Sequence, residues 1–451
     1  MGQTRQTARD EGVAASSANG GAADPFADLH PPLTATQAVV EADRCLYCYE
    51  APCIAACPTG IDIPTFIHQI RTGNLVGSAE TILEANIMGG TCARACPTEI
   101  LCEQACVLNA REREPVEIGR LQRHAVDHLL AANGPHPFTR APETGKRIAV
   151  VGAGPAGLAF AHEAARFGHS VTVYDARPKP GGLNEYGLAA YKMVNDFAQQ
   201  EVRFILGIGG IELRLGMGLG KELKLADLRA EYDAVFIGVG LTEPVPLGIP
   251  GEDAPAVEDA IDFIARLRQA EPKSSLALKG DVIVIGGGNT AIDAAVQARK
   301  LGAEMVHLVY RRGPEHMGAT HWEQDLARLN GVIFRHWARP VAIADRGDVA
   351  EVTFERTRLA DGRLAGTGEH FTLRAAHVLK AVGQRLAPEG LEELRREGGK
   401  LWVDDRYRTS LPGVYAGGDC IARTVDLTVQ AVEDGKQAAR SADAFLKEKE
   451  S

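Results

Sequence analysis

The chain has 451 residues and a formal net charge of -10, with 45% hydrophobic and 24% charged residues. This length is too great for a single hydrophobic core and predicts about two to four domains. The acidic balance gives no electrostatic reason to expect nucleic-acid binding. No apolar run reaches the roughly 18 residues that a membrane span needs, and the start lacks the pattern of a signal peptide. We therefore expect a globular cytoplasmic protein without a membrane segment.

The first 33 residues are rich in Gly, Ala, Ser and Asp and predict a flexible tail. Residues 34–143 predict a small helical domain, with helices over Thr65–Arg71, Ser78–Asn86 and Ile118–Ala131. Two bursts hold eight of the nine cysteines in this region: Cys45, Cys48, Cys53 and Cys57, then Cys92, Cys96, Cys102 and Cys106.

These clustered thiols are better explained as metal ligands than as disulfides, because the cytoplasm is reducing. Tight runs that end in Cys-Pro, as at Cys57 and Cys96, are typical of iron–sulfur clusters. Zinc sites favour CxxC pairs separated by a long spacer. The spacing therefore predicts two 4Fe-4S clusters, with two zinc sites as the alternative.

From Lys146 the pattern changes to alternating strands and helices, with two similar units about 130 residues apart. Each unit is a strand, a helix and a second strand: Arg147–Val151, Pro155–Phe167 and Val171–Tyr174, then Val282–Ile285, Asn289–Leu301 and Met305–Tyr310. Two such units predict two dinucleotide-binding folds in series. A helix over Ala254–Ala270 is expected to link them. The strand Val414–Gly418 and the helix Thr428–Lys447 are expected to complete the first fold.

A glycine motif joins the first strand to its helix: Gly152, Ala153, Gly154, Pro155, Ala156 and Gly157. Such glycines allow a tight turn and let the backbone approach a pyrophosphate at the helix N-terminus. Asp175 ends the second strand, where a carboxylate accepts the ribose hydroxyls of an unphosphorylated dinucleotide. Gly418 ends the C-terminal strand and Asp419 follows it. In a flavin site Asp419 would hydrogen-bond the ribityl or pyrophosphate region, and the N-terminus of the helix from Thr428 would face the flavin. Together these features predict an FAD site.

The second glycine motif is Gly286, Gly287, Gly288, Asn289, Thr290 and Ala291. Its second strand ends in Arg311 and Arg312 instead of an acid, and arginine suits a 2′-phosphate. This predicts an NADPH site, with NADH as the alternative cofactor. A solvated strand end is the other explanation of the two arginines.

No redox CxxC lies in either unit, so the sequence does not indicate a disulfide reductase. The single Cys420 is expected to be a small buried side chain beside the flavin. There is also no room for a (β/α)8 substrate domain, which needs about 250 residues. Electrons can pass through this chain, but we predict no catalytic acid or base.

The order of these motifs resembles the electron-input half of dihydropyrimidine dehydrogenase, over about residues 38–447. That half occurs as a separate bacterial subunit in the glutamate synthase small subunit-like family. The resemblance implies an α/β protein with an N-terminal α-helical iron–sulfur domain and two Rossmann-like domains, the second inserted in the first. The expected limits are 34–143 for the helical domain, 144–243 and 386–451 for the FAD-binding domain, and 244–385 for the NAD(P)H-binding domain.

The resemblance also implies a hetero-oligomer, in which a second subunit carries FMN, further iron–sulfur clusters and the pyrimidine site. There uracil or thymine would be reduced to the 5,6-dihydropyrimidine. The five residues between Cys96 and Cys102, and Gln122 where bifurcating relatives usually have glutamate, favour this assignment. The alternatives are a glutamate synthase small subunit, a ferredoxin-linked NADPH oxidoreductase, or a zinc-stabilised flavoprotein without enzymatic activity.

Ligand positions carried over from the family give one cluster Cys45, Cys48, Cys53 and Cys106, and the other Cys57, Cys96, Cys102 and Gln122. Cys92 falls on a family cysteine that is not a ligand. The flavin-contacting family positions are matched by Gly182, Leu183 and Lys192. The nicotinamide-dinucleotide positions are matched by Gly287–Thr290, Arg311, Arg312, Ala381, Val382 and Gly383. Gly318 stands where the family has a further arginine, which keeps NADH open.

Overall fold

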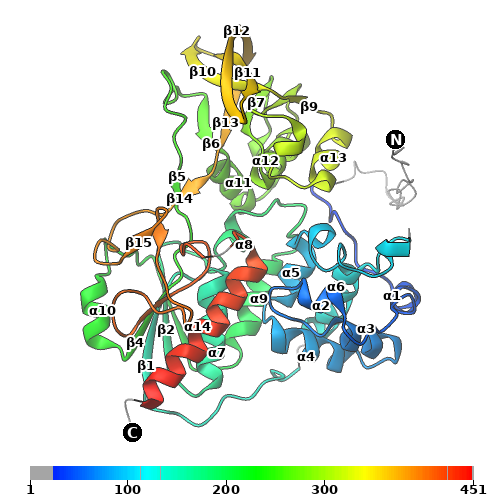
Figure 1. Cartoon of the computed structure of the whole chain (residues 1–451), viewed down its shortest axis with the longest axis vertical. Helices are drawn as coiled ribbons and strands as arrows, with labels where there is room; N and C mark the ends of the chain where they lie inside the picture. Colours follow the sequence, from blue (N-terminus) through cyan, green and yellow to red (C-terminus); the bar gives the residue numbers. More distant parts are fainter. Residues whose placement is uncertain (1–23, 112, 133, 424, 449–451) are drawn as a thin grey trace.

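The computed structural model of the chain describes residues 24–111, 113–132, 134–423 and 425–448. Figure 1 shows a helical part in blue and cyan, a sheet beside the long C-terminal helix, and a second sheet beyond it. The predicted class, a helical domain followed by two Rossmann-like domains, is confirmed. Among the described residues no helix has the length and apolar character to cross a membrane.

Short helices build the N-terminal domain: α1 (Ala35–Ala42), α2 (Pro52–Ala55), α3 (Ile63–Arg71), α4 (Leu75–Ala85), α5 (Gly89–Ala95) and α6 (Ile118–Ala131), with the 3-10 turns η1 (Thr98–Ile100) and η2 (Asn109–Arg111). Side chains cap three of them, since Thr34, Asp62 and Asn74 accept backbone N–H groups at the starts of α1, α3 and α4. The Asn74 cap explains why α4 begins at Leu75, three residues before the predicted Ser78.

The first Rossmann sheet has five parallel strands in the order β17-β4-β1-β2-β3. They are β1 (Arg147–Val151), β2 (Ser170–Asp175), β3 (Ile211–Leu215), β4 (Ala234–Ile237) and β17 (Val414–Ala416). The helices of this domain are α7 (Pro155–Arg166), α8 (Leu183–Tyr186), α9 (Phe197–Leu206), α10 (Leu225–Glu231) and α14 (Thr428–Glu448). Because β17 pairs with β4, the C-terminus completes this fold as predicted.

The second Rossmann sheet has the order β6-β13-β7-β8-β9. Its strands are β6 (Val257–Asp259), β7 (Val282–Gly286), β8 (Val306–Val309), β9 (Val332–Arg335) and β13 (His377–Ala381), and its helices are α11 (Ala260–Gln269), α12 (Asn289–Lys300) and α13 (His321–Leu329), with the 3-10 turns η3 (Lys273–Leu276) and η4 (Pro314–His316). The predicted linking helix is shorter than expected, because residues 257–259 pair as β6. An antiparallel sheet that was not predicted follows: β10 (Ala338–Asp345), β11 (Ala350–Ala360) and β12 (Arg363–Ala375).

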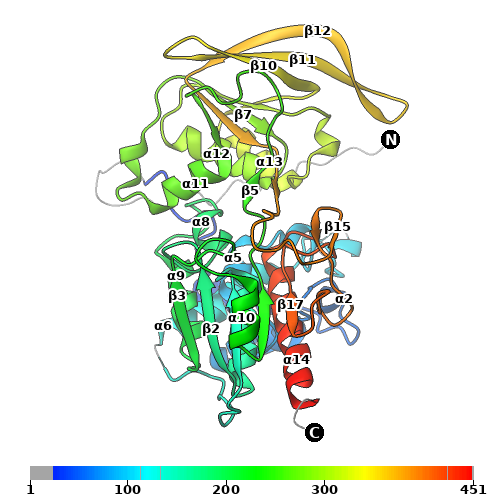
Figure 2. The same cartoon turned by 90° about the vertical axis from the view of Figure 1, so that its left-hand side faces the viewer.

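The chain passes between the two Rossmann domains through a narrow ribbon (Figure 2). It leaves at β5 (Glu243–Pro244) and returns at β14 (Gln384–Arg385), and these two strands pair antiparallel. A small hairpin follows, made of β15 (Arg396–Glu397) and β16 (Lys400–Leu401). The second domain is therefore inserted in the first.

The N-terminal segment departs from the predicted flexible tail, of which residues 1–23 lie outside the described part. Phe26 is 6% exposed and joins the apolar core of the second Rossmann domain. Asp28 pairs with Arg123 of α6 at 2.5 Å, and the Leu29 N–H donates to the carbonyl of Tyr191 at 2.9 Å. Residues 24–33 thus contact all three domains. The buried Phe26 ring and the Asp28–Arg123 ion pair offset the loss of conformational entropy on ordering this segment.

A buried carboxylate joins the helical domain to the first Rossmann domain. Glu201 of α9 is 2% exposed. It accepts hydrogen bonds from the Thr91 N–H at 2.9 Å and from the Thr91 hydroxyl. Burial raises the pKa of Glu201 from 4.5 to about 7, because the charged carboxylate is poorly solvated there.

We predict that Glu201→Gln gains stability relative to the wild type as the pH rises. Between pH 4.5 and about 7 the folded wild type holds a proton on Glu201 that the unfolded chain has released. Ionising Glu201 therefore removes up to roughly 3 kcal/mol of unfolding free energy across this window. Glutamine does not titrate. Urea unfolding at about pH 5 and about pH 8 measures the difference. The prediction is wrong if that difference is the same at both values.

Candidate cofactor sites

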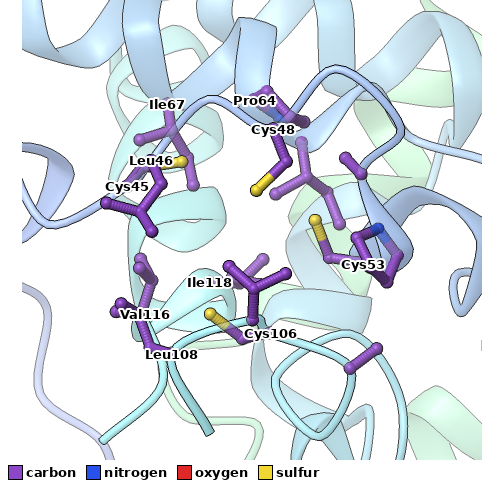
Figure 3. Close-up of a pocket in the computed structure, with 15 residues that line it drawn as sticks. Cys45, Leu46, Cys48, Cys53, Pro64, Ile67, Cys106, Leu108, Val116 and Ile118 are labelled. Atoms are coloured by element: carbon purple, nitrogen blue, oxygen red, sulfur yellow. The ribbon is translucent and has the colours of Figure 1, made fainter. Parts of the chain in front are cut away.

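Four cysteines from two separate segments face one cavity in the helical domain. Cys45, Cys48 and Cys53 come from the first burst and Cys106 from the end of the second. Apolar side chains such as Ile67, Val116 and Ile118 complete the wall of the cavity. Figure 3 shows the four sulfur atoms facing one another across it. The structure thus brings together the four residues of the first proposed ligand set.

These thiols are embedded in apolar surroundings. Burial raises the pKa of the Cys53 thiol to about 11 and also raises the pKa of Cys45. Cys45 and Cys53 therefore lose their protons readily only when a cation takes the proton's place, as metal binding does. Among the described residues no three His, Cys, Asp or Glu side chains are arranged to hold a single metal ion.

A second group of thiols lies where η1 follows α5. The Cys96 thiol interacts with Cys92 through a hydrogen bond, which together with burial and the nearby thiols of Cys102 and Cys57 raises the pKa of Cys96. Burial likewise raises the pKa of Cys102, with Cys57 nearby. Cys92 is fully buried while the other three are half-buried. The three residues of the second ligand set that are cysteines are therefore neighbours.

Gln122 lies on the buried face of α6, 7% exposed. Its side-chain amide donates to the carbonyl oxygen of Gly89 at 2.6 Å, so it is anchored to α5, the helix that leads to Cys96. Gly119, one turn earlier on α6, donates its N–H to Glu103 at 3.0 Å, beside Cys102. Gln122 is therefore held among the segments that carry the second group of thiols.

The first glycine motif forms a turn that excludes side chains. A Cβ on Gly152 would lie 2.3 Å from the carbonyl oxygen of Gly238, and one on Gly157 would lie 1.8 Å from that of Gly152. A Cβ on Gly154 would meet nothing closer than Gly182 at 3.7 Å. The open side of the turn is therefore at Gly154, and this is the space that a pyrophosphate would use.

Asp175 stands at the end of β2, where it braces the same turn. Its carboxylate accepts the Ala153 N–H at 2.7 Å and the Arg177 N–H at 2.8 Å. Burial raises the pKa of Asp175. Gly182 has φ of +54° and lies against Gly154, followed by the partly exposed Leu183. These residues surround the open side of the first glycine turn.

The C-terminal turn lies beside α14. Burial, followed by the charge of Asp426, raises the pKa of Asp419 to about 6. The Thr428 hydroxyl, at the start of α14, donates to the Asn184 side chain at 3.2 Å. Sequence reasoning missed Asp434, which is fully buried and accepts the Gly418 N–H at 2.9 Å. The sequence did offer one indication of Asp434: this carboxylate lies six residues into the helix that follows the Gly-Gly-Asp turn.

Asp434 has a glycine neighbour that lets α14 rest on α7. A Cβ on Gly435 would lie 2.1 Å from the carbonyl oxygen of Ala156, a residue of the first glycine motif. The Tyr407 hydroxyl and the Gln430 amide also donate to Asp434. The two halves of the first Rossmann domain therefore meet at the glycine turn itself.

The second glycine motif has the same construction. A Cβ on Gly286 would lie 2.2 Å from the carbonyl oxygen of Ala381, while one on Gly288 would meet nothing within 4 Å. The Asn289 side-chain oxygen is buried without a hydrogen-bond partner in the described structure. Gly318 approaches Gly288, where a Cβ on Gly318 would be 3.9 Å from the Gly288 Cα.

The strand-end residues and the β13 edge surround this open turn. Arg311 is exposed, and Arg312 is half-buried with an Nε that lacks a partner among the described residues. Val382 is 39% exposed and Gly383 has φ of +109°, just after β13. Thr290 is exposed at the start of α12. An open glycine turn beside an unpartnered amide oxygen and guanidinium nitrogen fits a dinucleotide.

Two residues lie in surroundings that sequence reasoning did not foresee in full. Lys192, carried over as a flavin-contacting position, is buried and bonds to Asp293 and Glu323 of the second Rossmann domain, at 2.8 and 2.5 Å. Cys420 is buried, as expected, and its thiol donates to the carbonyl oxygens of Gly417 and Ile237. All nine cysteines are free.

This combination defines a nucleotide-dependent oxidoreductase with an iron–sulfur domain. The family described as pyridine nucleotide-disulphide oxidoreductase matches residues 146–435, and the domain described as dihydropyrimidine dehydrogenase domain II, 4Fe-4S cluster, matches residues 22–133. The chain belongs to the pyridine nucleotide-disulphide oxidoreductase family. FAD, NAD(P)H and a 4Fe-4S cluster are the cofactors of these domains.

Three relatives are similar to this chain over more than nine-tenths of its length. The NAD-dependent dihydropyrimidine dehydrogenase subunit PreT of Salmonella typhimurium is 34% identical, covering 93% of this chain and 97% of its own length. The glutamate synthase [NADPH] small chain of Escherichia coli (strain K12) is 33% identical, with 92% of each covered. AegA of the same organism is 35% identical over 92% of this chain, which spans 66% of that protein's length.

A solved structure supports the fold. Mycobacterium tuberculosis FprA in complex with NADPH is similar with a TM-score of 0.58 at 21% identity, covering 69% of this chain and 86% of that one.

The sequence resembles the electron-input subunit of dihydropyrimidine dehydrogenase within the glutamate synthase small subunit-like family. The matched 4Fe-4S domain and the PreT and glutamate synthase relatives confirm this resemblance.

We predict different outcomes for alanine at two glycines of the first motif. Gly157→Ala must displace backbone, because its Cβ would sit 1.8 Å from a carbonyl oxygen. It should therefore lower both thermal stability and FAD content. Gly154→Ala has room in the protein and occupies the proposed pyrophosphate space, so it should lower FAD content with little change in the apoprotein's Tm. Differential scanning fluorimetry of apoprotein and flavin release on denaturation check both. Equal Tm losses would contradict the placement of the pyrophosphate.

Proposed function

We propose that this chain passes electrons from NAD(P)H through FAD and two 4Fe-4S clusters to a partner subunit. That partner would carry FMN and further iron–sulfur clusters and would reduce uracil or thymine to the 5,6-dihydropyrimidine. The observation that carries the proposal is the meeting of Cys106 with Cys45, Cys48 and Cys53 around one cavity. A cysteine from the second burst completes the first set, as the resemblance requires.

The first cluster is proposed to bind Cys45, Cys48, Cys53 and Cys106. The second is proposed to bind Cys57, Cys96, Cys102 and Gln122. Two observations support the second set: the three thiols are neighbours, and Gln122 is buried against α5. A glutamine oxygen in place of a thiolate makes the cluster less negative, which changes its reduction potential.

The FAD site is proposed to lie over Gly154, between Asp175, Gly182 and the turn at Asp419. Bound there, a flavin would take a hydride from the nicotinamide and give electrons singly to the clusters. The chain's own residues position it: the open turn receives the pyrophosphate, Asp175 the ribose hydroxyls, and the N-terminus of α14 at Thr428 stabilises negative charge.

The nicotinamide dinucleotide is proposed to lie over Gly288, with Asn289, Arg311 and Arg312 around it. The two arginines favour NADPH, since a guanidinium pairs well with a 2′-phosphate. Gly318, in place of a family arginine, removes one such contact. The printed name of the PreT relative includes NAD and that of the glutamate synthase relative includes NADPH, so each assay below is run with both nucleotides.

Co-expression tests the partner assignment. The chain should form a complex with an FMN-containing barrel protein from the same genome, and the anaerobic complex should oxidise NADPH or NADH only when uracil or thymine is added. The glutamate synthase large subunit from the same genome serves as the comparison. Glutamate formation with that subunit, and no pyrimidine reduction with the barrel protein, would show that the alternative function is correct.

Gln122→Ala should alter one cluster and leave the other unchanged, because Gln122 belongs to only one proposed set. In reduced, anaerobically purified protein we expect one EPR signal to shift or disappear, with the second signal and FAD content retained. Cys92→Ser is the matched control, since this thiol lies beside the same cluster without serving as a ligand, and iron and sulfide content should be kept. Two unaltered signals in the Gln122 variant would contradict the ligand assignment.

Metal analysis of the wild-type protein tests the zinc alternative. Zinc without acid-labile sulfide in the wild type would favour that alternative.

A further inference from the structure

A short segment of the first Rossmann domain docks on the second. Three consecutive residues make this contact, Ala190, Tyr191 and Lys192. The Ala190 N–H donates to the Gln297 side chain at 2.9 Å, and the Tyr191 hydroxyl donates to Asp293 at 3.1 Å. Gln297 and Asp293 lie one turn apart on α12, the helix that begins at the second glycine motif. The docked segment therefore forms hydrogen bonds with α12, the helix whose N-terminus would bind the nicotinamide dinucleotide.

Lys192 extends this contact to a second helix. Its ammonium group lies 2.8 Å from Asp293 of α12 and 2.5 Å from Glu323 of α13, and all three residues are at most 8% exposed. The two carboxylates raise the pKa of Lys192 despite its burial, so the side chain is a cation. A buried cation between two carboxylates of another domain fixes both distance and direction between the domains.

Apolar packing surrounds this ion cluster. Ala189, Ala190 and Tyr191 are buried in the same apolar core as α12 and strands β7 and β8. Phe26 of the N-terminal segment joins that core. The Lys300 ammonium at the end of α12 donates to the carbonyl of Pro25 at 2.7 Å. The core of the second domain is therefore completed by residues from outside it.

The N-terminal segment covers the docked segment from the other side. The His30 ring lies 5.0 Å from the ring of Trp322, the residue before Glu323. Arg123 of α6 donates to the His30 carbonyl at 2.5 Å and pairs with Asp28. The N-terminal segment thus links α13, next to Glu323 in the sequence, with α6 of the helical domain.

The covalent connection alone would leave the second domain free to move. It consists of the paired strands β5 and β14, each of two residues. Domains joined in this way move relative to one another unless their interface is large and apolar. Hydride transfer requires the donor and acceptor atoms to be in contact and aligned, and a displacement of about 1 Å can cost a hundredfold in rate.

We propose that Lys192 is an interdomain positioning residue, which holds the NAD(P)H-binding domain at the distance and angle that hydride transfer to the flavin requires. Asp293 and Glu323 are its partners. This inference rests on the proposed function, since it assigns a role within the NAD(P)H-to-FAD step. It differs from a flavin contact by Lys192, because the effect acts through the two carboxylates.

The test is anaerobic stopped-flow reduction of the bound flavin by saturating NADPH or NADH. We expect Lys192→Met to slow the limiting rate roughly tenfold to hundredfold, with FAD content kept and with unchanged flavin reduction by dithionite. Lys192→Arg, which keeps the cation, should restore most of the rate. Lys447→Met is the matched control, because Lys447 pairs with Asp443 within a single domain, and its rate should equal that of the wild type.

A variant of the two partners separates positioning from flavin contact. Asp293→Asn combined with Glu323→Gln should slow reduction as much as Lys192→Met, and the triple variant should be no slower than either. A wild-type rate in the partner variant, or in Lys192→Met, would overturn the proposal. If Lys192→Met does not retain FAD, the triple variant, which leaves no unpaired buried charge, gives the same comparison. Failure of the wild type to accept electrons from either nucleotide would instead overturn the proposed function.

Discussion

The four sulfur atoms of Cys45, Cys48, Cys53 and Cys106 face one cavity that no protein atom fills (Figure 3). The N-terminal domain has its helices arranged around this cavity. Its helices are too short to be stable alone, since α2 has four residues and α5 has seven. Half-buried thiols and apolar side chains together make its core. With the proposed cluster bound, metal would replace the thiol protons, so binding of the cluster and folding of this domain would be coupled. The cores of the two Rossmann domains are formed by apolar side chains instead.

The parts that sequence could predict are those specified over short distances. The glycine motifs follow from a strand, a turn and a helix that are adjacent in sequence, and each proved to be a turn with one open glycine, Gly154 or Gly288. The helix Ile118–Ala131 and the strand Arg147–Val151 have the predicted bounds for the same reason. The grouping of Cys106 with the first burst came from the family resemblance and was not contained in the spacing.

The parts that sequence missed depend on contacts between distant segments. Nothing near Phe26 indicates a residue of a core that is otherwise formed by Ala189–Tyr191 and by residues from Ala260 onward, so a segment rich in small residues looked like a tail. Lys192 could be aligned with a flavin-contacting position, but its carboxylate partners, Asp293 and Glu323, lie more than 100 residues away and on another domain. Asp434 was missed because a helix carboxylate usually faces water, whereas here it is enclosed by Gly418, Tyr407 and Gln430.

The first Rossmann domain lies between two interfaces of different construction. Toward the second domain it presents Ala190–Lys192, where a buried cation fixes the geometry. Toward the helical domain it presents Glu201 to Thr91 and Lys436 to the carbonyl of Ala85 at 2.6 Å. Hydride transfer needs contact between two rings, and electron transfer falls steeply with distance, so both steps demand fixed separations. A flexible ribbon could provide neither. In the proposed electron path, the polar contacts buried on each side of the first Rossmann domain would therefore hold the cofactors at fixed separations.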